Sequence, residues 1–441
     1  MKKSNLYLTI FLGVILIGLL CWLYFGNYLE MEKPEIKLNR EISPMGKQKI
    51  VEIIFSDQKS GLSNLKAEII QDNKGRIITE EKISSRGIKQ KILSLTIDAA
   101  ALNLNDGSAT INITARDYSL FRNQTILSQP VIIDMKPPQI ILPGTVNYFN
   151  QGGTGFIAYR VSEPAAATGI YINDHFTPGH TLTQNNKPAF VAYFAVPLFA
   201  SNQNTKIIVF ARDEAGNEAK SALPCIIQEK KFRSDKLNLS KSFLQQKMPE
   251  FQSATPQLQG KTLVEVFGHV NSQMREDNDK AIQVICQKSA GKKLWEGTFL
   301  RMRNAATMAS FGDKRAYVVD GKDFGSSIHF GVDLASSAHA AIYAANNGIV
   351  VFAGTLGIYG NTVIIDHGLG LFSLYAHLSL IETTAGKNVK KEELIGHSGT
   401  TGLAGGDHLH FGILVDGQFV NPLEWWDPHW IEDNINKKMR F

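Results

Sequence analysis

The chain has 441 residues, which at about 100–200 residues per domain predicts two to four domains. It is 44% hydrophobic and 20% charged, a composition typical of globular proteins with enough apolar material for several cores. The net charge of +5 is small for this length and the basic residues form no cluster, so no nucleic-acid partner is expected. Three cysteines are too few for a disulfide framework, and we expect Cys225 and Cys286 to be ordinary small residues, with a disulfide between them left open.

Residues 6–25 form an apolar run without a charge, long enough to cross the hydrocarbon core of a bilayer as a helix. Lys2 and Lys3 precede the run, so the positive-inside rule keeps residues 1–5 in the cytoplasm and exports the rest. A cleaved signal peptide is the alternative, but the run ends in bulky residues without a small-x-small cleavage site. We therefore expect an uncleaved single-pass anchor in the cytoplasmic (inner) membrane, with the remainder of the chain in the periplasm or cell-wall space.

From residue 26 to residue 232 the sequence predicts short strands separated by Gly, Asn, Asp and Pro. The clearest strands are β-branched or alternating and cover residues 51–55, 92–97, 110–115, 155–161 and 206–211.

Two short motifs recur in this part of the chain. The segment 33–36 (KPEI) returns as 136–140 (KPPQI), and 115–117 (ARD) returns as 211–213. The repeat predicts two tandem β-sandwiches, at 26–135 and 136–232. Residues 209–217 (VFARDEAGN) resemble the final strand of bacterial immunoglobulin-like domains, which implies a spacer or binding module and leaves its role open.

Residues 233–297 change character, because apolar residues recur there at helical spacing with charges on the other face. We expect a helical connector. Whether it restrains the segment that follows is left open. A strand-rich domain at 298–426 and a tail at 427–441 complete the expected organisation, which is mainly β.

Histidine is concentrated near the end of the chain, where eight of eleven lie between His329 and His429. Residues 408–415 alternate and precede the turn dipeptide Asp416-Gly417, so they predict a half-buried strand that continues into a hairpin. The period of two places His408 and His410 on one face of this strand. His329 and Asp333, four residues apart, also return to one side of the chain.

These residue types suit a catalytic zinc site, which takes three imidazole or carboxylate ligands and leaves a fourth position for water. His329, Asp333 and one of the pair His408/His410 supply that set. A water on the metal has its pKa lowered to about 7, and His377 and the other member of the pair remain for proton transfer and oxyanion stabilisation. The sequence has no His-Glu-x-x-His motif, so a glutamate-base metalloprotease of that kind is excluded.

The surrounding motifs strengthen this prediction. Segments 329–335 (HFGVDLA), 359–368 (YGNTVIIDHG), 375–379 (YAHLS), 399–402 (GTTG), 408–411 (HLHF) and 421–423 (NPL) together resemble the lysostaphin-type (LytM-like) zinc endopeptidases. The resemblance implies an antiparallel β domain that cleaves peptide cross-links of bacterial peptidoglycan. It also implies that Zn²⁺ is bound by His329, Asp333 and His410, with His377 and His408 as the catalytic pair.

A second function stays open, that of a catalytically inactive LytM-like regulator that binds and activates cell-wall hydrolases. Such regulators typically lack zinc ligands or catalytic histidines, and retention of all five positions favours the enzyme. Departures from the family pattern occur at Arg315, Gly412 and Ala338-His339, and they bear on substrate preference. The sequence does not determine which peptide bond is cut, although a D-amino-acid cross-link fits an exported, anchored protein, nor does it determine the oligomeric state.

Overall fold

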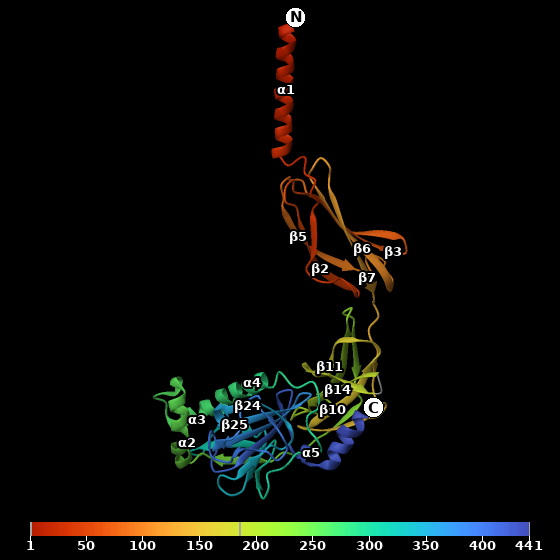
Figure 1. Ribbon diagram of the computed structural model, residues 1–441. Coiled ribbons are helices and arrows are strands. Elements are labelled where there is room, and N and C mark those ends of the chain that lie inside the picture. The colour runs from red at the N-terminus through yellow and green to blue at the C-terminus, as the bar shows by residue number, and fades with distance from the viewer. Residues whose placement is uncertain (1, 185–186, 441) are drawn as a thin grey trace. The chain divides into compact units, whose positions relative to one another are not determined.

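The computed structural model describes residues 2–184 and 187–440 and confirms a mainly β chain preceded by an apolar helix (Figure 1). The chain divides into two compact units. Unit 1 comprises residues 1–138, 163–166 and 212–219, and unit 2 comprises residues 139–162, 167–211 and 220–441.

Helix α1 (Lys2–Phe25) contains the apolar run. Over Leu6–Phe25 its mean hydropathy is 2.5 and its side chains are not buried against the rest of the protein. A helix satisfies its own backbone hydrogen bonds, which a segment in hydrocarbon requires. The helix is therefore long and apolar enough to cross a membrane, as either an anchor or a signal sequence.

Two antiparallel sheets in unit 1 share one apolar core. Side chains that alternate between the two faces of each strand position this core. In β6 (Gly107–Asp117) the buried residues are Ala109, Ile111, Ile113 and Ala115, and the residues between them are more exposed. The three strands expected at 51–55, 92–97 and 110–115 are confirmed. One sheet has the order β1 (Glu35–Leu38), β2 (Gln48–Ser56), β5 (Gln90–Asp98), and the other β4 (Lys74–Lys82), β3 (Leu62–Gln71), β6 (Gly107–Asp117), β7 (Gln124–Ile133).

The second strand-rich segment lies mostly in unit 2, and the strands expected at 155–161 and 206–211 are confirmed. One sheet has the strand order β13 (His180–Gln184), β14 (Lys187–Ala195), β10 (Thr154–Val161), β8 (Ile140–Ile141). A second has the order β12 (His175–Pro178), β11 (Ala165–Ile172), β15 (Ile207–Asp213), β16 (Glu218–Ala222). The third is the parallel pair β17 (Cys225–Gln228) and β9 (Asn147–Asn150).

The largest sheet of unit 2 is antiparallel and carries the histidine motifs. Its order is β19 (Ala306–Ala309), β22 (Val332–Ala335), β30 (Leu409–Val415), β26 (Leu371–Leu378), β25 (Asn361–Gly368), β24 (Gly348–Thr355), β28 (Asn388–Val389), with β31 (Gln418–Val420) paired to β30. Two small sheets accompany it: β18 (Ser234–Asn238), β20 (Lys314–Val319), β21 (Lys322–Ile328), and β23 (Ala341–Tyr343), β29 (Leu394–His397), β27 (Leu380–Ile381).

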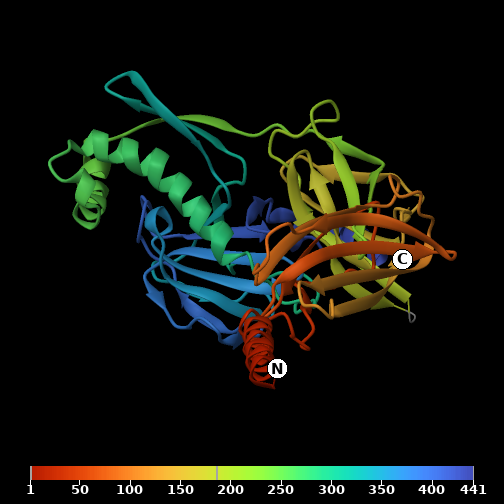
Figure 2. The ribbon, with the colours of Figure 1, turned by 90° about the horizontal axis from the view of Figure 1, so that it is seen from above.

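Three helices of the expected connector cover one face of this sheet: α2 (Lys241–Ala254), α3 (Leu263–His269) and α4 (Arg275–Ile285) (Figures 1 and 2). Helix α3 begins where it does because Thr262 and Glu265 form a reciprocal capping box. Phe267 and Ile282 of the helices share a core with Leu414 and other residues of the sheet.

The helical cover corrects one expectation about β30. The sequence predicted a half-buried strand, but every residue from Leu409 to Val415 is buried. Leu409 and Phe411 enter the core on one face of the sheet, whereas Leu414 on the other face lies under the helices. The alternation identified the two faces correctly and did not show that a distant segment covers the second one.

The core on the first face continues into the β10–β14 sheet. Trp425 of α5 (Leu423–Trp426) packs against Tyr193 and donates a 2.9 Å hydrogen bond from Nε1 to Oγ1 of Thr154. Beside it, the buried Glu424 accepts hydrogen bonds from Nδ2 of Asn150 at 2.8 Å and from the backbone N–H of Thr154 at 2.6 Å. One core therefore joins the second strand-rich segment to the histidine-bearing sheet.

Glu424 makes the stability of unit 2 depend on pH. Burial raises its pKa from 4.5 to about 7, despite the hydrogen bonds that favour its charge. The folded chain then holds a proton that the unfolded chain has lost, so stability falls as pH rises through this interval, by at most about 3 kcal/mol at about 1.4 kcal/mol per pKa unit.

We expect chemical denaturation to show that the free energy of unfolding falls less between about pH 5 and pH 8 for Glu424→Gln than for wild type. The exposed control Glu229→Gln should match wild type, and equal slopes for all three proteins would contradict this role.

Candidate metal centre

The register of three neighbouring strands positions the first part of the site. Asp333 of β22 lies opposite His410 of β30, and Ala376 of β26 lies opposite His410 on its other side. Residues opposite each other on neighbouring strands project from the same face. Because Leu334 and Leu409 enter the core, Asp333 and His410 project from the other face of the sheet.

His377 reaches this face through an irregularity in its strand. In a regular strand His377 would point to the opposite face of the sheet from Ala376 and His410. Instead its backbone φ is +62°, and the register between β25 and β26 shifts beside it. Leu378, which follows, consequently packs into the same core as Tyr375. Such bulges are common next to functional sites because they redirect a side chain.

His329, Asp333 and His410 form a buried triangle. Nε2 of His329 lies 2.8 Å from Oδ1 of Asp333 and 3.0 Å from Nδ1 of His410, and the third side, from Nδ1 of His410 to Oδ1 of Asp333, is 2.9 Å. Gly331 permits this approach, because a Cβ there would lie 2.5 Å from the His410 ring. The three residues form a group able to hold a metal ion.

The donor set fits zinc. Ligands 2.0–2.2 Å from a tetrahedral ion are about 3.3 Å apart, close to the sides of this triangle, and two imidazoles with one carboxylate leave a fourth position open. Nδ1 of His329 lies 3.0 Å from the carbonyl oxygen of Ser310, which can only accept, so that nitrogen carries the proton and Nε2 presents a lone pair.

His377 and His408 lie beside the triangle with their rings 4.9 Å apart. Each donates from Nδ1 to a backbone carbonyl at 2.8 Å, Thr401 for His377 and Gly406 for His408. Both imidazoles are therefore fixed in orientation with Nε2 as the free nitrogen, and Nε2 of His408 lies 3.5 Å from Oδ1 of Asp333.

The surroundings shift the pKa values of these groups in different directions. Burial alone would raise the pKa of Asp333, but hydrogen bonds from His329, His408 and His410 outweigh it and hold that pKa well below its usual range. Burial lowers the pKa of His410 to about 4 and, together with the neighbouring His408 and His410, lowers that of His377 well below 6.5. Burial also opposes the charge on His408, but the carboxylate of Asp333 raises its pKa. At neutral pH the cluster thus combines a carboxylate with neutral His377 and His410.

The structure corrects the role expected for Arg315, which contacts the predicted metal ligand Asp333, and adds site residues that the sequence did not identify. Arg315 donates a 3.3 Å hydrogen bond to Oδ2 of Asp333, which leaves Oδ1 to the histidines. A cleft of about 240 Å³ opens over the cluster, and Arg275 and Asp279 of α4 line it together with Tyr359. Arg315 could be found by its position shortly before the motif, whereas Arg275 and Asp279 come from the connector and carry no motif.

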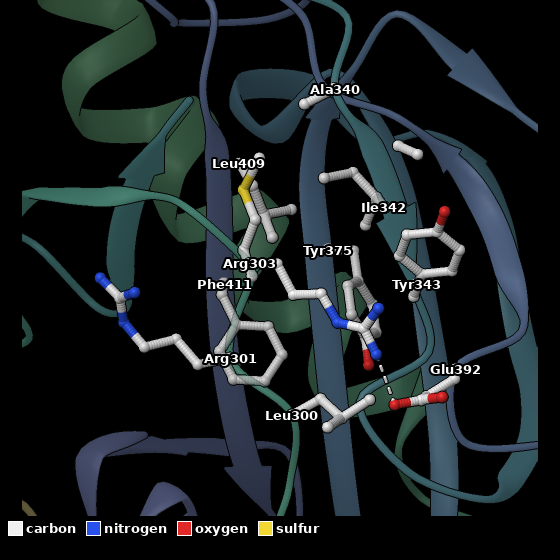
Figure 3. Close-up of a pocket in the computed structure, with 12 residues that line it drawn as sticks. Leu300, Arg301, Arg303, Ala340, Ile342, Tyr343, Tyr375, Glu392, Leu409 and Phe411 are labelled. Atoms are coloured by element: carbon white, nitrogen blue, oxygen red, sulfur yellow. Dashed lines mark hydrogen bonds and ion pairs between the residues drawn. The ribbon is translucent and has the colours of Figure 1, made fainter. Parts of the chain in front are cut away.

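A second cavity, of about 160 Å³, lies on the opposite face of β30 (Figure 3). Leu409 and Phe411 line it, and its charged pair is Arg303 and Glu392, joined by a 2.6 Å hydrogen bond. Its lining contains no histidine, whereas four histidines line the cleft over the triangle.

Comparisons with known proteins agree with the motifs. Residues 327–422 match Peptidase family M23, which confirms the resemblance to lysostaphin-type peptidases.

The chain is 42% identical over 96 residues to the DD-carboxypeptidase/endopeptidase Mpg of Neisseria meningitidis serogroup B, covering 22% of each chain. It is 36% identical over 96 residues to the peptidoglycan DD-endopeptidase ShyA of Vibrio cholerae, again 22% of each. To the murein hydrolase activator NlpD of Escherichia coli it is 40% identical over 96 residues, 22% of this chain and 25% of the relative. The matches thus span about a quarter or less of these relatives.

Substitutions should separate the metal ligands from their neighbours. We expect His410→Ala to purify with little zinc, because it removes a corner of the triangle, whereas His377→Ala should retain about one zinc per chain. The exposed His429, outside the triangle, provides the matched control His429→Ala. Metal analysis of the purified proteins is the measurement. Zinc retained by His410→Ala but lost from His377→Ala would contradict this assignment.

Proposed function

We propose that the M23 domain at residues 327–422 is a zinc metalloendopeptidase that hydrolyses peptide cross-links of bacterial peptidoglycan. The observation that carries the proposal is the buried His329–Asp333–His410 triangle with two further oriented imidazoles beside it in one cleft. Two relatives named as peptidoglycan or DD-endopeptidases support the substrate class.

Zinc, held by His329, Asp333 and His410, would lower the pKa of water to near neutrality and polarise a carbonyl oxygen. The chain supplies the rest of the chemistry. Arg315 fixes one oxygen of Asp333 and Ser310 fixes the tautomer of His329, so the ligands are oriented in advance.

His377 and His408 would handle protons and developing charge. Neutral His377 can accept a proton at Nε2, because its Nδ1–H is already committed to Thr401. The raised pKa of His408 favours a protonated Nε2, which can donate to an oxyanion or a leaving amine. Two imidazoles whose pKa values are displaced in opposite directions suit a base and an acid.

The walls of the cleft would bind the peptide. Arg275 and Arg315 provide positive charge and Tyr359 provides an aromatic surface beside the triangle. This combination fits a peptide that carries carboxylates, because arginine recognises carboxylates through paired hydrogen bonds. We place the domain in the periplasm or cell-wall space, with α1 as an uncleaved anchor in the cytoplasmic membrane.

The alternative is a catalytically inactive regulator that activates other wall hydrolases, as the name of the relative NlpD suggests for that protein. The intact cluster argues against it. A regulator needs neither a buried metal triangle nor two oriented imidazoles, and a binding surface alone does not require the free-energy cost of burying these polar groups.

Digestion of purified peptidoglycan separates the two functions. We expect the zinc-loaded full-length protein in detergent to release cross-linked peptides as monomers, identified by mass spectrometry. His377→Ala should lower the rate by about 10²–10⁴-fold, because it removes a proton-transfer group, while the exposed control His429→Ala should match wild type.

The regulator predicts a different outcome. Wild type would release no peptides alone, yet it would accelerate a second wall hydrolase added to the assay, and His377→Ala would accelerate it equally. That result would contradict the proposed peptidase.

A further inference from the structure

Unit 1 contains a second group of buried acidic side chains, which the peptidase chemistry does not use. Glu30 lies five residues after the end of α1, Asp57 follows β2, and Asp117 ends β6. One carboxylate oxygen from each lies within 4.8 Å of the others. Their exposed fractions are 4%, 3% and 1%, respectively, so three acidic groups share a site shielded from water.

Ion pairs within the described residues leave this group uncompensated, and Lys59 contributes only a longer-range attraction to Glu30. Among the described residues, no lysine or arginine nitrogen lies within ion-pair distance of the three carboxylates, and the nearby Lys59 pairs with the exposed Glu32 instead. Burial raises the pKa of Asp57, and the charges of Glu30 and Asp117 add to this rise. Buried carboxylates without a counter-charge are strongly unfavourable unless they are protonated or bind a cation.

The hydrogen bonds leave acceptor atoms unused. Glu30 accepts from the backbone N–H of Ser60 at 2.6 Å through Oε2, and Asp57 accepts from that of Gly61 at 2.5 Å through Oδ2. Oε1 of Glu30, Oδ1 of Asp57 and Oγ of Ser60 are buried without a hydrogen-bond partner. Side-chain oxygens that are buried and unpartnered are rare, and they are the ligands that hard cations prefer.

The same arrangement occurs at a repeat of the sequence. Asn123 donates from Nδ2 to Asp117 at 2.7 Å and to the carbonyl oxygen of Glu30 at 2.9 Å. Asn217 likewise donates from Nδ2 to Asp213 at 2.9 Å and to the carbonyl oxygen of Asp134 at 2.7 Å.

Asp134 and Asp213 belong, with Glu163, to another group whose carboxylate oxygens lie within 4.8 Å of one another. Glu30-Met31 and Asp134-Met135 both stand shortly before a Lys-Pro pair. The repeat thus reproduces the acidic group together with the asparagine that holds it.

We propose that Glu30, Asp57 and Asp117 bind a calcium ion. Calcium takes six to eight oxygen ligands at about 2.3–2.6 Å in flexible geometry, and three carboxylates with a serine hydroxyl provide such ligands, which backbone carbonyls and water complete. The group offers no nitrogen or sulfur ligand, so zinc is disfavoured.

Calcium would connect the segment after α1 to the strand ends of unit 1. That segment already contacts the unit: the backbone N–H of Leu120 donates to the carbonyl oxygen of Tyr28 at 2.9 Å, and Arg86 lies over the Tyr28 ring. Glu30 already accepts hydrogen bonds from Ser60 and Asn123, and a shared cation would strengthen this connection between helix and β unit.

Calorimetric titration of the zinc-loaded full-length protein in calcium-free buffer tests the proposal. Chelators are avoided because they would also remove zinc. We expect calcium binding with a Kd in the range of about 10⁻⁴–10⁻³ M that is typical of extracellular modules, and a higher melting temperature at about 5 mM calcium.

Substitutions then locate the ion. Asp57→Asn should bind one calcium fewer and lose the calcium-dependent rise in melting temperature that this site provides. In calcium-free buffer it should melt at or above wild type, because one buried charge is gone. Glu30→Gln should behave in the same way, and the exposed control Glu32→Gln should match wild type.

Three results would overturn the proposal: no calcium bound by wild type at about 5 mM, unchanged stoichiometry in both Asp57→Asn and Glu30→Gln, or magnesium bound as tightly as calcium. Peptidoglycan digestion by the same preparations reports separately on the M23 domain, so failure of one proposal does not imply failure of the other.

Discussion

Asp333 lies opposite His410 on adjacent strands, and the rest of the site is arranged around this pair. A buried carboxylate is costly, and here three imidazoles and Arg315 surround it at 2.8–3.5 Å. Because the pair belongs to the hydrogen-bonded ladder of the sheet, neither side chain can move far without disturbing the strands. The register of the sheet thus positions two of the three candidate ligands more rigidly than a loop would, whereas His329 lies between β21 and β22.

The sheet keeps that register because both of its faces are covered. One face packs into a core shared with the second strand-rich segment, and the other packs under helices α2–α4. Helix α4 also lines the cleft with Arg275 and Asp279. The connector therefore supports the sheet and borders the cleft at once, so an isolated segment starting at residue 298 would expose the apolar face that the helices cover.

The site could be predicted from sequence where local periodicity decides the structure. The period of two brought His408 and His410 together, and the motifs identified His329 and Asp333. The same reasoning could not position His377, whose orientation depends on a bulge with φ of +62°. It also missed the helical cover of β30 and the meeting of Glu30, Asp57 and Asp117, because these contacts join residues far apart in the chain.

X-ray absorption at the zinc edge would show whether His329, Asp333 and His410 hold the metal. For the full-length protein we expect a shell of nitrogen and oxygen donors at about 2.0–2.2 Å with the outer scattering of two imidazoles. His408→Ala should leave this spectrum unchanged, because His408 lies outside the triangle. A sulfur donor, or a spectrum that loses an imidazole in His408→Ala, would show that these three residues are not the ligand set.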